Sequence, residues 1–433
     1  MRNIRFYETD AAFKAYEQGA GGDGNSTKTS IPGVSGAWDL GKTYFNPHDE
    51  TKLTHTVTVK YVSMYDGTEL ADSETIEIKY LSGVSQELIL YPKVIDGYVA
   101  KEEKIIANIP EDTSIVFYYK VKLDYKKPLT FNIISAGTIY WKAQSTAYTT
   151  TIEYSTDSGK TWTSVASNTG TSAPSISVNA GDVVQFRGDN ATYATDTSYY
   201  NFFNGSTAKF EAEGNIMSLI DSTNFARETT LASSYTFYNL FYNCTGLTSA
   251  ERLVLPATTL TSSCYNGMFS YCRSLTTAPE LPATTLATNC YIGMFSRCTS
   301  LTTAPELPAT TLARYCYYYM FNDCTSLTTA PKLPATTLAW DCYRGMFYNC
   351  TSLTRAPELP ATTLADDCYQ TMFYGCTSLN YIKCLATNIS ASYCTTNWVN
   401  GVASTGTFVK AASMSSWTTG GNGIPANWTV QDA

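Results

Sequence analysis

The chain has 433 residues, of which only 15% are charged, and its formal net charge is -8. A chain of this length holds several domains, and its acidic balance argues against nucleic acid, which needs a basic face to neutralise phosphates. Few charges together with 33 tyrosines favour β-rich modules that face the outside world over a cytosolic enzyme. No apolar run is long enough to span a bilayer, and the first residues lack the apolar centre of a signal peptide.

Residues 1–50 are predicted to be an attachment segment. A short helix-like stretch over residues 10–18 runs into "GAGGDGNST", a flexible Gly-rich joint. A short hairpin with Gly and Pro turns is expected in "IPGVSGAWDLGKTYFNPHDE". The unit is too small to hold a hydrophobic core alone.

Residues 51–125 are predicted to form a β module. Four segments alternate apolar and polar residues with a period of two, and turn residues separate them. The stretch from "VTVKYVSMYDGTELADSETIEI" through "GYVAKEEKI" to "SIVFYYK" resembles the mucin-binding-protein (MucBP) repeats of bacterial surface proteins. The resemblance implies a small β-grasp-like fold, and mucin binding does not carry over with it.

Residues 126–225 are predicted to form a β-sandwich-like domain, since strand patterns continue through "LTFNIIS", "GTIYWKA", "TTTIEYS" and "SISVNAGDVVQFRG". The segment "STDSGKTW", from Ser155 to Trp162, matches the Asp-box pattern S-x-D-x-G-x-T-W. Asp and Gly suit a tight turn, and Trp162 is expected to pack against the hairpin. Sialidases carry several such boxes beside an arginine cluster. This sequence has a single box and no such cluster, so the box predicts a hairpin and not a glycosidase.

A repeat fills residues 226–397. A Leu-Pro step recurs every 26 residues, at Pro256, Pro282, Pro308, Pro334 and Pro360. Periods of about 20–29 residues are typical of leucine-rich repeats, whose coils stack because one coil cannot bury its own apolar side. The phrase "CYxxMFxxCTSLTTAPELPATTLA" resembles the BspA-like leucine-rich repeats of surface proteins of gut bacteria and of their phages. The expected fold is multidomain and mainly β, with β-grasp-like and β-sandwich modules followed by a 26-residue-period leucine-rich-repeat solenoid.

One side of each return segment repeats, and the other side varies. With Cys290 at 0° and about 100° per residue, as in a helix, the repeated letters fall on one face. Core packing tolerates little change in volume, so the repeated face is predicted to be core, although Gly293 weakens the helix prediction. The repeated face contains Cys290, Tyr291, Met294, Phe295 and Cys298, and the varying face contains Thr288, Asn289, Ile292, Ser296 and Arg297. The strand side is expected to point Leu301, Ala304, Leu307 and Leu312 inward.

Twelve of the 13 cysteines follow the repeat in two columns, the first beginning at Cys264 and the second at Cys244. Stacked thiols of one column could approach disulfide distance, but each would have two equal neighbours and the total is odd. The Cys-x7-Cys spacing matches no zinc pattern. Buried free thiols are therefore expected. The leftover Cys384 takes a strand position that is expected to be exposed.

Residues 398–433 depart from the repeat and are predicted to form a C-terminal cap, in which Trp398 replaces the repeated methionine. No catalytic pattern emerges. The two histidines, His48 and His55, lie far from the repeated cysteines, so a Cys/His nucleophile is unsupported. Asp366 and Asp367 are neighbours on a return segment, where side chains diverge. We expect no enzyme, no metal and no cofactor.

The varying face is the candidate ligand-binding site. Aromatic and arginine side chains are typical of binding surfaces because they bury area with little loss of entropy. Alternatively, a solvent face in a Tyr-rich chain collects tyrosines without binding anything. The candidate residues are Arg314, Tyr315, Tyr318, Tyr319, Trp340, Asp341, Arg344 and Tyr348.

Two functions from different classes agree with these patterns. "MRNIRFYETDAAFKAY" and "PGVSGAWDLGKTYFNP" resemble the N-terminal leaders of fibre and appendage proteins of tailed phages that infect gut bacteria. This resemblance implies a non-enzymatic virion protein, docked on other virion proteins by residues 1–50. It also implies a homo-oligomer, with a trimer favoured, whose repeats contact a host glycan or surface protein. The missing export signal agrees with it. The alternative is a bacterial cell-surface adhesin of the BspA-like kind, and neither function requires nucleic acid or membrane insertion.

Overall fold

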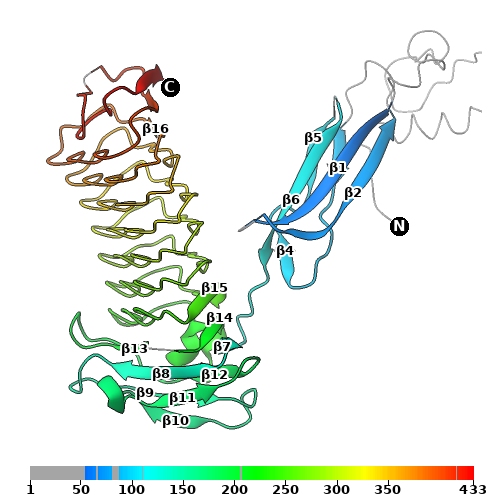
Figure 1. Cartoon of the computed structure of the whole chain (residues 1–433), viewed down its shortest axis with the longest axis vertical. Coiled ribbons are helices and arrows are strands. Elements are labelled where there is room, and N and C mark those ends of the chain that lie inside the picture. Colours follow the sequence, from blue (N-terminus) through cyan, green and yellow to red (C-terminus); the bar gives the residue numbers. More distant parts are fainter. Residues whose placement is uncertain (1–53, 65–66, 80–86, 110, 205–206, 416) are drawn as a thin grey trace, which may run out of the picture. The chain divides into compact units, whose positions relative to one another are not determined.

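The computed structural model describes residues 54–64, 67–79, 87–109, 111–204, 207–415 and 417–433. The fold is mainly β and contains several sheets, as predicted. The chain forms two compact units, which divide between Lys122 and Leu123 (Figure 1). The predicted attachment segment, residues 1–50, lies outside the described residues.

The first unit contains a four-stranded sheet in the order β2-β1-β6-β4 and a two-stranded sheet of β3 and β5. β1 pairs in parallel with β6, and β2 and β4 pair antiparallel with their neighbours. Val57 and Phe117 from the larger sheet share one buried apolar cluster with Leu88 from the smaller sheet. The strands are β1 (Thr54–Ser63), β2 (Glu69–Lys79), β3 (Glu87–Leu90), β4 (Tyr98–Ala100), β5 (Ile105–Asn108) and β6 (Thr113–Val121). The period-two segments of residues 51–125 are thus confirmed as strands.

The second unit begins with two sheets, in the orders β10-β9-β12-β7-β14-β15 and β11-β8-β13. Their apolar sides meet where the ring of Phe203 lies 5.1 Å from Phe131 and 5.0 Å from Phe186, measured between ring centroids. Three short 3-10 helices accompany them, η2 (Gly170–Ser172), η3 (Ile216–Leu219) and η4 (Phe225–Arg227). The strands are β7 (Leu129–Ser135), β8 (Gly137–Ala143), β9 (Thr151–Ser155), β10 (Thr163–Ala166), β11 (Ser175–Val178), β12 (Val183–Arg187), β13 (Asn201–Phe203), β14 (Lys209–Asn215) and β15 (Leu247–Val254).

The Asp-box segment forms the turn between β9 and β10, as predicted. The Asp157 carboxylate accepts backbone N–H groups from Lys160 at 3.0 Å and from Thr161 at 2.9 Å. The Trp162 indole N–H donates to the Gly159 carbonyl at 3.0 Å, and its ring lies 4.1 Å below the Arg187 guanidinium. These contacts hold the hairpin together.

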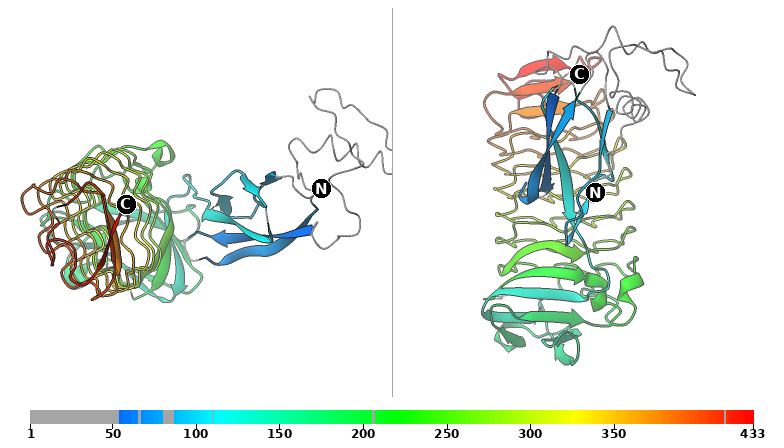
Figure 2. Two further views of the ribbon diagram at one scale, coloured as in Figure 1. Left: turned by 90° about the horizontal axis from the view of Figure 1, so that it is seen from above. Right: turned by 90° about the vertical axis from the view of Figure 1, so that its right-hand side faces the viewer.

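After the sheets the chain winds into stacked coils, residues 230–401, which we call the coil stack; Figure 2 (left) looks along it. Isolated parallel bridges join Thr285 to Thr311 and Thr311 to Thr337, so neighbouring coils lie in a 26-residue register. Continuous strands do not form between these bridges, because prolines such as Pro305 and Pro308 lack an N–H to donate. Three parallel strands follow near the end, β16 (Tyr381–Cys384), β17 (Thr407–Lys410) and β18 (Thr429–Asp432).

The return segments are chains of tight turns, and the helical geometry expected for them was wrong. Within one coil, the Met294 N–H donates to the Tyr291 carbonyl at 3.2 Å. The N–H of the next residue, Phe295, donates instead to Met320 of the next coil at 2.9 Å. Hydrogen bonds therefore alternate between turns inside a coil and a ladder between coils.

The backbone angles explain this geometry. Every fourth residue is left-handed, with φ of 62° at Asn289, 53° at Gly293 and 63° at Arg297. A left-handed residue cannot belong to a right-handed helix, and Gly and Asn tolerate that conformation best. Over nine residues a period of four differs little from 3.6, so the predicted division into two faces is confirmed. The side chains predicted to face the core, Cys290, Tyr291, Met294, Phe295 and Cys298, are all at most 2% exposed.

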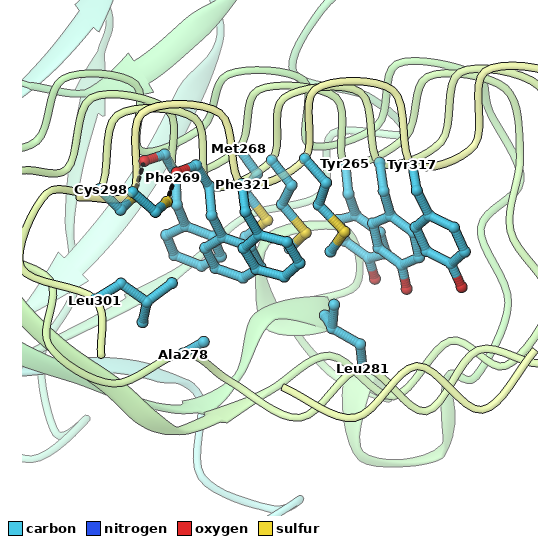
Figure 3. Packing of buried hydrophobic residues seen from close by; sticks show 14 of the residues in the cluster. Tyr265, Met268, Phe269, Ala278, Leu281, Cys298, Leu301, Tyr317 and Phe321 are labelled. Carbon is cyan, nitrogen blue, oxygen red and sulfur yellow. Dashed lines mark hydrogen bonds between the residues drawn. The ribbon is translucent and has the colours of Figure 1, made fainter. Parts of the chain in front are cut away.

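Two columns of stacked rings form the core of the coil stack (Figure 3). In one column, Phe269, Phe295 and Phe321 lie 5.4 and 5.6 Å apart between centroids. The other column contains Tyr265, Tyr291, Tyr317, Tyr343 and Tyr369, with centroids 5.7 to 6.2 Å apart.

The columns begin on the sheets and end on one tryptophan. Phe131 of β7 lies 6.1 Å from Phe241, the first ring of the phenylalanine column. At the other end, Trp398 lies 6.1 Å from Tyr369 and 6.3 Å from Phe373, so it covers both columns. The predicted segments 126–225, 226–397 and 398–433 therefore share one continuous core.

All 13 cysteines are free and buried, as expected for twelve of them. Cys384 is 0% exposed, which corrects the expectation of an exposed thiol, because β16 turns Ile382 and Cys384 inward together. In the second cysteine column, the Cys298 thiol donates to the Phe269 carbonyl of the preceding coil at 3.1 Å. The same contact recurs at Cys324, so these cysteines are repeated as hydrogen-bond donors as well as small apolar groups.

Candidate functional site

The eight candidate residues lie on the outward side of two consecutive return segments, residues 314–323 and 340–349. The ladder between coils fixes their backbone, since Tyr315 N–H donates to Trp340 and Tyr319 N–H donates to Arg344. Side-chain contacts connect all eight residues into one network, which we call the outer network. The sequence alone predicted their shared face, and the structure adds how they contact one another.

Arg314 and Trp340 form one end of the outer network. The Arg314 guanidinium lies 3.5 Å from the centroid of the Trp340 ring and 4.7 Å from that of Tyr315. It also donates a hydrogen bond to the Tyr315 hydroxyl at 3.1 Å. Trp340 is 46% exposed, which is high for so large an apolar side chain. This end therefore presents a flat, amphipathic surface.

Arg344 occupies the centre of the outer network. Its guanidinium contacts the Asp341 carboxylate at 3.1 Å and the Asp367 carboxylate at 3.6 Å. Although burial acts to lower the pKa of Arg344, the hydrogen bond and charge of Asp341 outweigh it and raise that pKa. Asp341 is only 1% exposed, so it orients Arg344 and does not itself face a ligand, which corrects its place among the binding residues.

A row of tyrosines forms the other end. Tyr318 lies 4.6 Å from Tyr319, which lies 6.0 Å from Tyr348, and Tyr348 stacks on Tyr374 at 4.8 Å with an interplanar angle of 6°. Tyr374 was not among the candidate residues, nor was Asp367, which also accepts the Trp340 indole N–H at 3.1 Å. Each lies 26 residues after a candidate, Tyr348 or Asp341, so extending the repeat by one coil identifies both.

Tyr319 combines a left-handed backbone with a matching neighbour in the next coil. Its φ is 50°, in the left-handed region that costs a residue other than glycine about 1 kcal/mol or more. A Cβ atom on Gly345 would lie 2.4 Å from the Tyr319 ring. The bare backbone of Gly345 therefore makes room for that ring.

The titratable side chains near the outer network are constrained by burial and by hydrogen bonds. Burial raises the pKa of thiols such as Cys316 and Cys342 in the same coils, so they stay protonated at neutral pH. Asp366 is exposed, and it accepts the Ser392 backbone N–H at 2.8 Å. Among the described residues, no group of three or more histidine, cysteine or acidic side chains is placed to hold a metal ion. In the same residues, no helix has the length and hydropathy needed to cross a bilayer.

Comparison with known proteins finds no match among family models, curated proteins or solved structures.

Proposed function

We propose that this chain is a non-enzymatic structural protein of a phage virion, a fibre or appendage, whose coil stack presents a binding face to the host surface. The outer network carries this proposal. It gathers the exposed Trp340 ring, half-buried tyrosine rings and two guanidinium groups on the side of the coils that varies, while the opposite side repeats. Aromatic and arginine side chains placed together on a rigid support are typical anchors of a binding site.

We also propose the finer fold that this role requires. The coil stack is a leucine-rich-repeat solenoid, supported by its 26-residue register and its columns of repeated core rings. The two sheets before it form a β-sandwich whose strand β14 pairs in parallel with β15, the first strand of the stack. The first unit is a β-grasp-like MucBP module, supported by the parallel pairing of β1 with β6.

The virion assignment draws on the resemblance of residues 1–50 to phage leaders, and these residues would dock on other virion proteins. Peptide mass spectrometry on gradient-purified phage particles and on washed host envelopes tests it. Recovery at a fixed copy number per particle, in multiples of three for a trimer, supports the proposal. Recovery in the envelope alone overturns it and supports the alternative, a bacterial cell-surface adhesin, which the MucBP-like module favours.

The binding role has a separate test with a matched control. Arg355 lies 3.5 Å over the Tyr381 ring, the same geometry as Arg314 over Trp340, but outside the outer network. We expect Trp340→Ala to weaken attachment of the full chain to host cells at least tenfold and Tyr381→Ala to leave it within twofold. If both variants attached to host cells as well as the original chain does, the outer network would have no part in host binding.

A further inference from the structure

Taken together with Asp367, which contacts Arg344 and Trp340, the outer network carries no net formal charge, because the two arginines Arg314 and Arg344 balance the carboxylates of Asp341 and Asp367. Arg344 already contacts both carboxylates, and Asp367 accepts the Trp340 indole N–H as well. A charged ligand group at Arg344 would have to displace these internal contacts and leave a partly buried charge without its partner, which is costly. The guanidinium of Arg314 is engaged instead by the rings of Tyr315 and Trp340 and by the Tyr315 hydroxyl.

Rings and hydroxyl groups supply the rest of the surface. The quadrupole of an aromatic ring makes its face negative, so the ring attracts weakly positive C–H groups. Each tyrosine adds a hydroxyl that both donates and accepts. Burial raises the pKa of Tyr318 and Tyr348, and these hydroxyls therefore stay protonated near neutral pH. Such a surface fits a ligand that alternates C–H faces with hydroxyl groups.

The surface is a row and not a broad patch. From Tyr315 the rings continue through Tyr318 and Tyr319 to Tyr348 and Tyr374, with successive centroids 4.6 to 6.0 Å apart. The row crosses three successive coils, at about 5 Å per coil. A protein partner would require a wider contact, about 800 Å² on each side for a standard interface. A row one ring wide suits an extended chain ligand.

The structure holds the row in place before any ligand arrives. The corresponding left-handed position is Gly or Asn in five other coils, at Asn239, Gly267, Gly293, Gly345 and Asn397. Tyr319 occupies it at a conformational cost, and Gly345 leaves the space into which the Tyr319 ring fits. Thr371 is a second exception at this position, with φ of 53°, but the next coil places Asn397 and not glycine there. The combination of a strained Tyr319 with room left by Gly345 therefore points to a role for the ring itself.

We propose that this row binds an uncharged oligosaccharide and that Gly345 positions Tyr319 for that contact. The inference rests on the proposed host-binding function and names its ligand class. The contacting residues are Tyr315, Tyr318, Tyr319, Trp340, Tyr348 and Tyr374.

The test applies the full chain to an array of neutral and acidic oligosaccharides and measures affinity for the best probe. Gly345→Ala and Gly293→Ala impose the same backbone strain, with φ of 60° and 53°, but only the first places a Cβ against the Tyr319 ring. We expect binding to neutral probes, an affinity at least tenfold lower in Gly345→Ala, and a change within twofold in Gly293→Ala. Circular dichroism melts confirm that both variants fold. A third variant, Tyr318→Phe, keeps the ring but removes the hydroxyl, and we expect it to lower the affinity for the best probe a few fold.

Two results would overturn the inference and leave the proposed function intact. One is a preference for sialylated or sulfated probes. The other is no binding to any oligosaccharide while Trp340→Ala still abolishes attachment to host cells, which indicates a protein receptor. If the original chain bound no oligosaccharide and also failed to attach to host cells, the host-binding function itself would be contradicted.

Discussion

The inward and outward sides of the return segments differ although they share one backbone. On the inward side, the phenylalanine rings of successive coils are parallel within 7°. On the outward side, the ring pairs of the two central coils meet at angles from 32° to 83°, although Tyr348 stacks on Tyr374 of the following coil at 6°. The ladder between coils uses backbone groups alone, so it fixes the chain without specifying the outward side chains. The coil stack can therefore keep its core constant while its surface changes.

The largest expected effect is an alkaline loss of stability on the inward side. Burial raises the pKa of Cys298 and Cys350 well above the ordinary value of 9.0. Below pH 9 the thiols are protonated in both states, and above it they ionise in the unfolded chain only. The unfolded state then binds fewer protons, so the free energy of unfolding falls as pH rises. Each such thiol contributes about 1.4 kcal/mol per pH unit.

Urea denaturation under reducing conditions from pH 7 to pH 10.5, followed by tryptophan fluorescence, measures this effect. We expect a flat midpoint up to about pH 8.5 and a steep fall above pH 9. The double variant Cys298→Ala/Cys350→Ala is expected to be less stable at neutral pH. Above pH 9 its free energy of unfolding falls less steeply with pH, because two of the ionising thiols are absent. An unchanged midpoint between pH 8 and pH 10 would show that the thiols ionise in the folded chain.

The second prediction compares rings from the two sides. Phe321 is 0% exposed and stacks on the rings of both neighbouring coils, whereas Tyr348 is half-buried at the surface. Phe321→Ala is expected to lower the free energy of unfolding by about 3–5 kcal/mol, because it opens a cavity in the column. Tyr348→Ala is expected to cost less than about 1 kcal/mol. Chemical denaturation measures both free energies, and equal losses would contradict the division into an inward core side and an outward surface side.

Repetition made the core predictable from the sequence. The residues around Tyr291 and Phe295 repeat in the five coils between the first and the last because stacked neighbours fix their volume, and this constraint is visible without a structure. The strands of both units were equally accessible, since their period of two follows from one buried face.

The turn geometry and the contacts within the site could not be predicted from the sequence in the same way. A period of four with left-handed residues resembles a helix over so short a segment, and only Gly293 and the Asn and Asp residues at equivalent positions indicated otherwise. Asp341 belongs to the varying letters yet is buried where Arg344 contacts it, and Ser263 is buried at the equivalent position three coils earlier. The repeat shows which side chains vary but not how deeply each of them lies.

The third prediction tests whether the buried Asp341 organises the outer network, with the exposed Asp366 as its control. Asp341→Asn keeps a residue that tolerates the left-handed backbone but removes the charge that faces Arg344. Because Arg344 is one-third exposed and retains Asp367, the expected loss is about 1–3 kcal/mol, below that of a fully buried pair. The exposed Asp366→Asn is the control, with an expected change within about 0.5 kcal/mol. Thermal melts and urea denaturation compare them, and equal small effects would show that Asp341 does not organise the outer network.

The smallest expected effect is a gain in stability on the outward side. Thr371 is β-branched and has φ of 53°, a conformation that suits glycine and asparagine far better. Other coils place Asn239 and Asn397 at the same position. Thr371→Asn is therefore expected to raise the free energy of unfolding by about 0.5–1 kcal/mol through relief of backbone strain.

The control is Thr310→Asn at an exposed position without positive φ, where the expected change is within about 0.5 kcal/mol of zero. A loss of stability in Thr371→Asn would mean that its hydroxyl, which donates to the Gln370 carbonyl at 2.8 Å, outweighs the strain. The outward side would then be constrained by its own side chains and not by the backbone ladder alone.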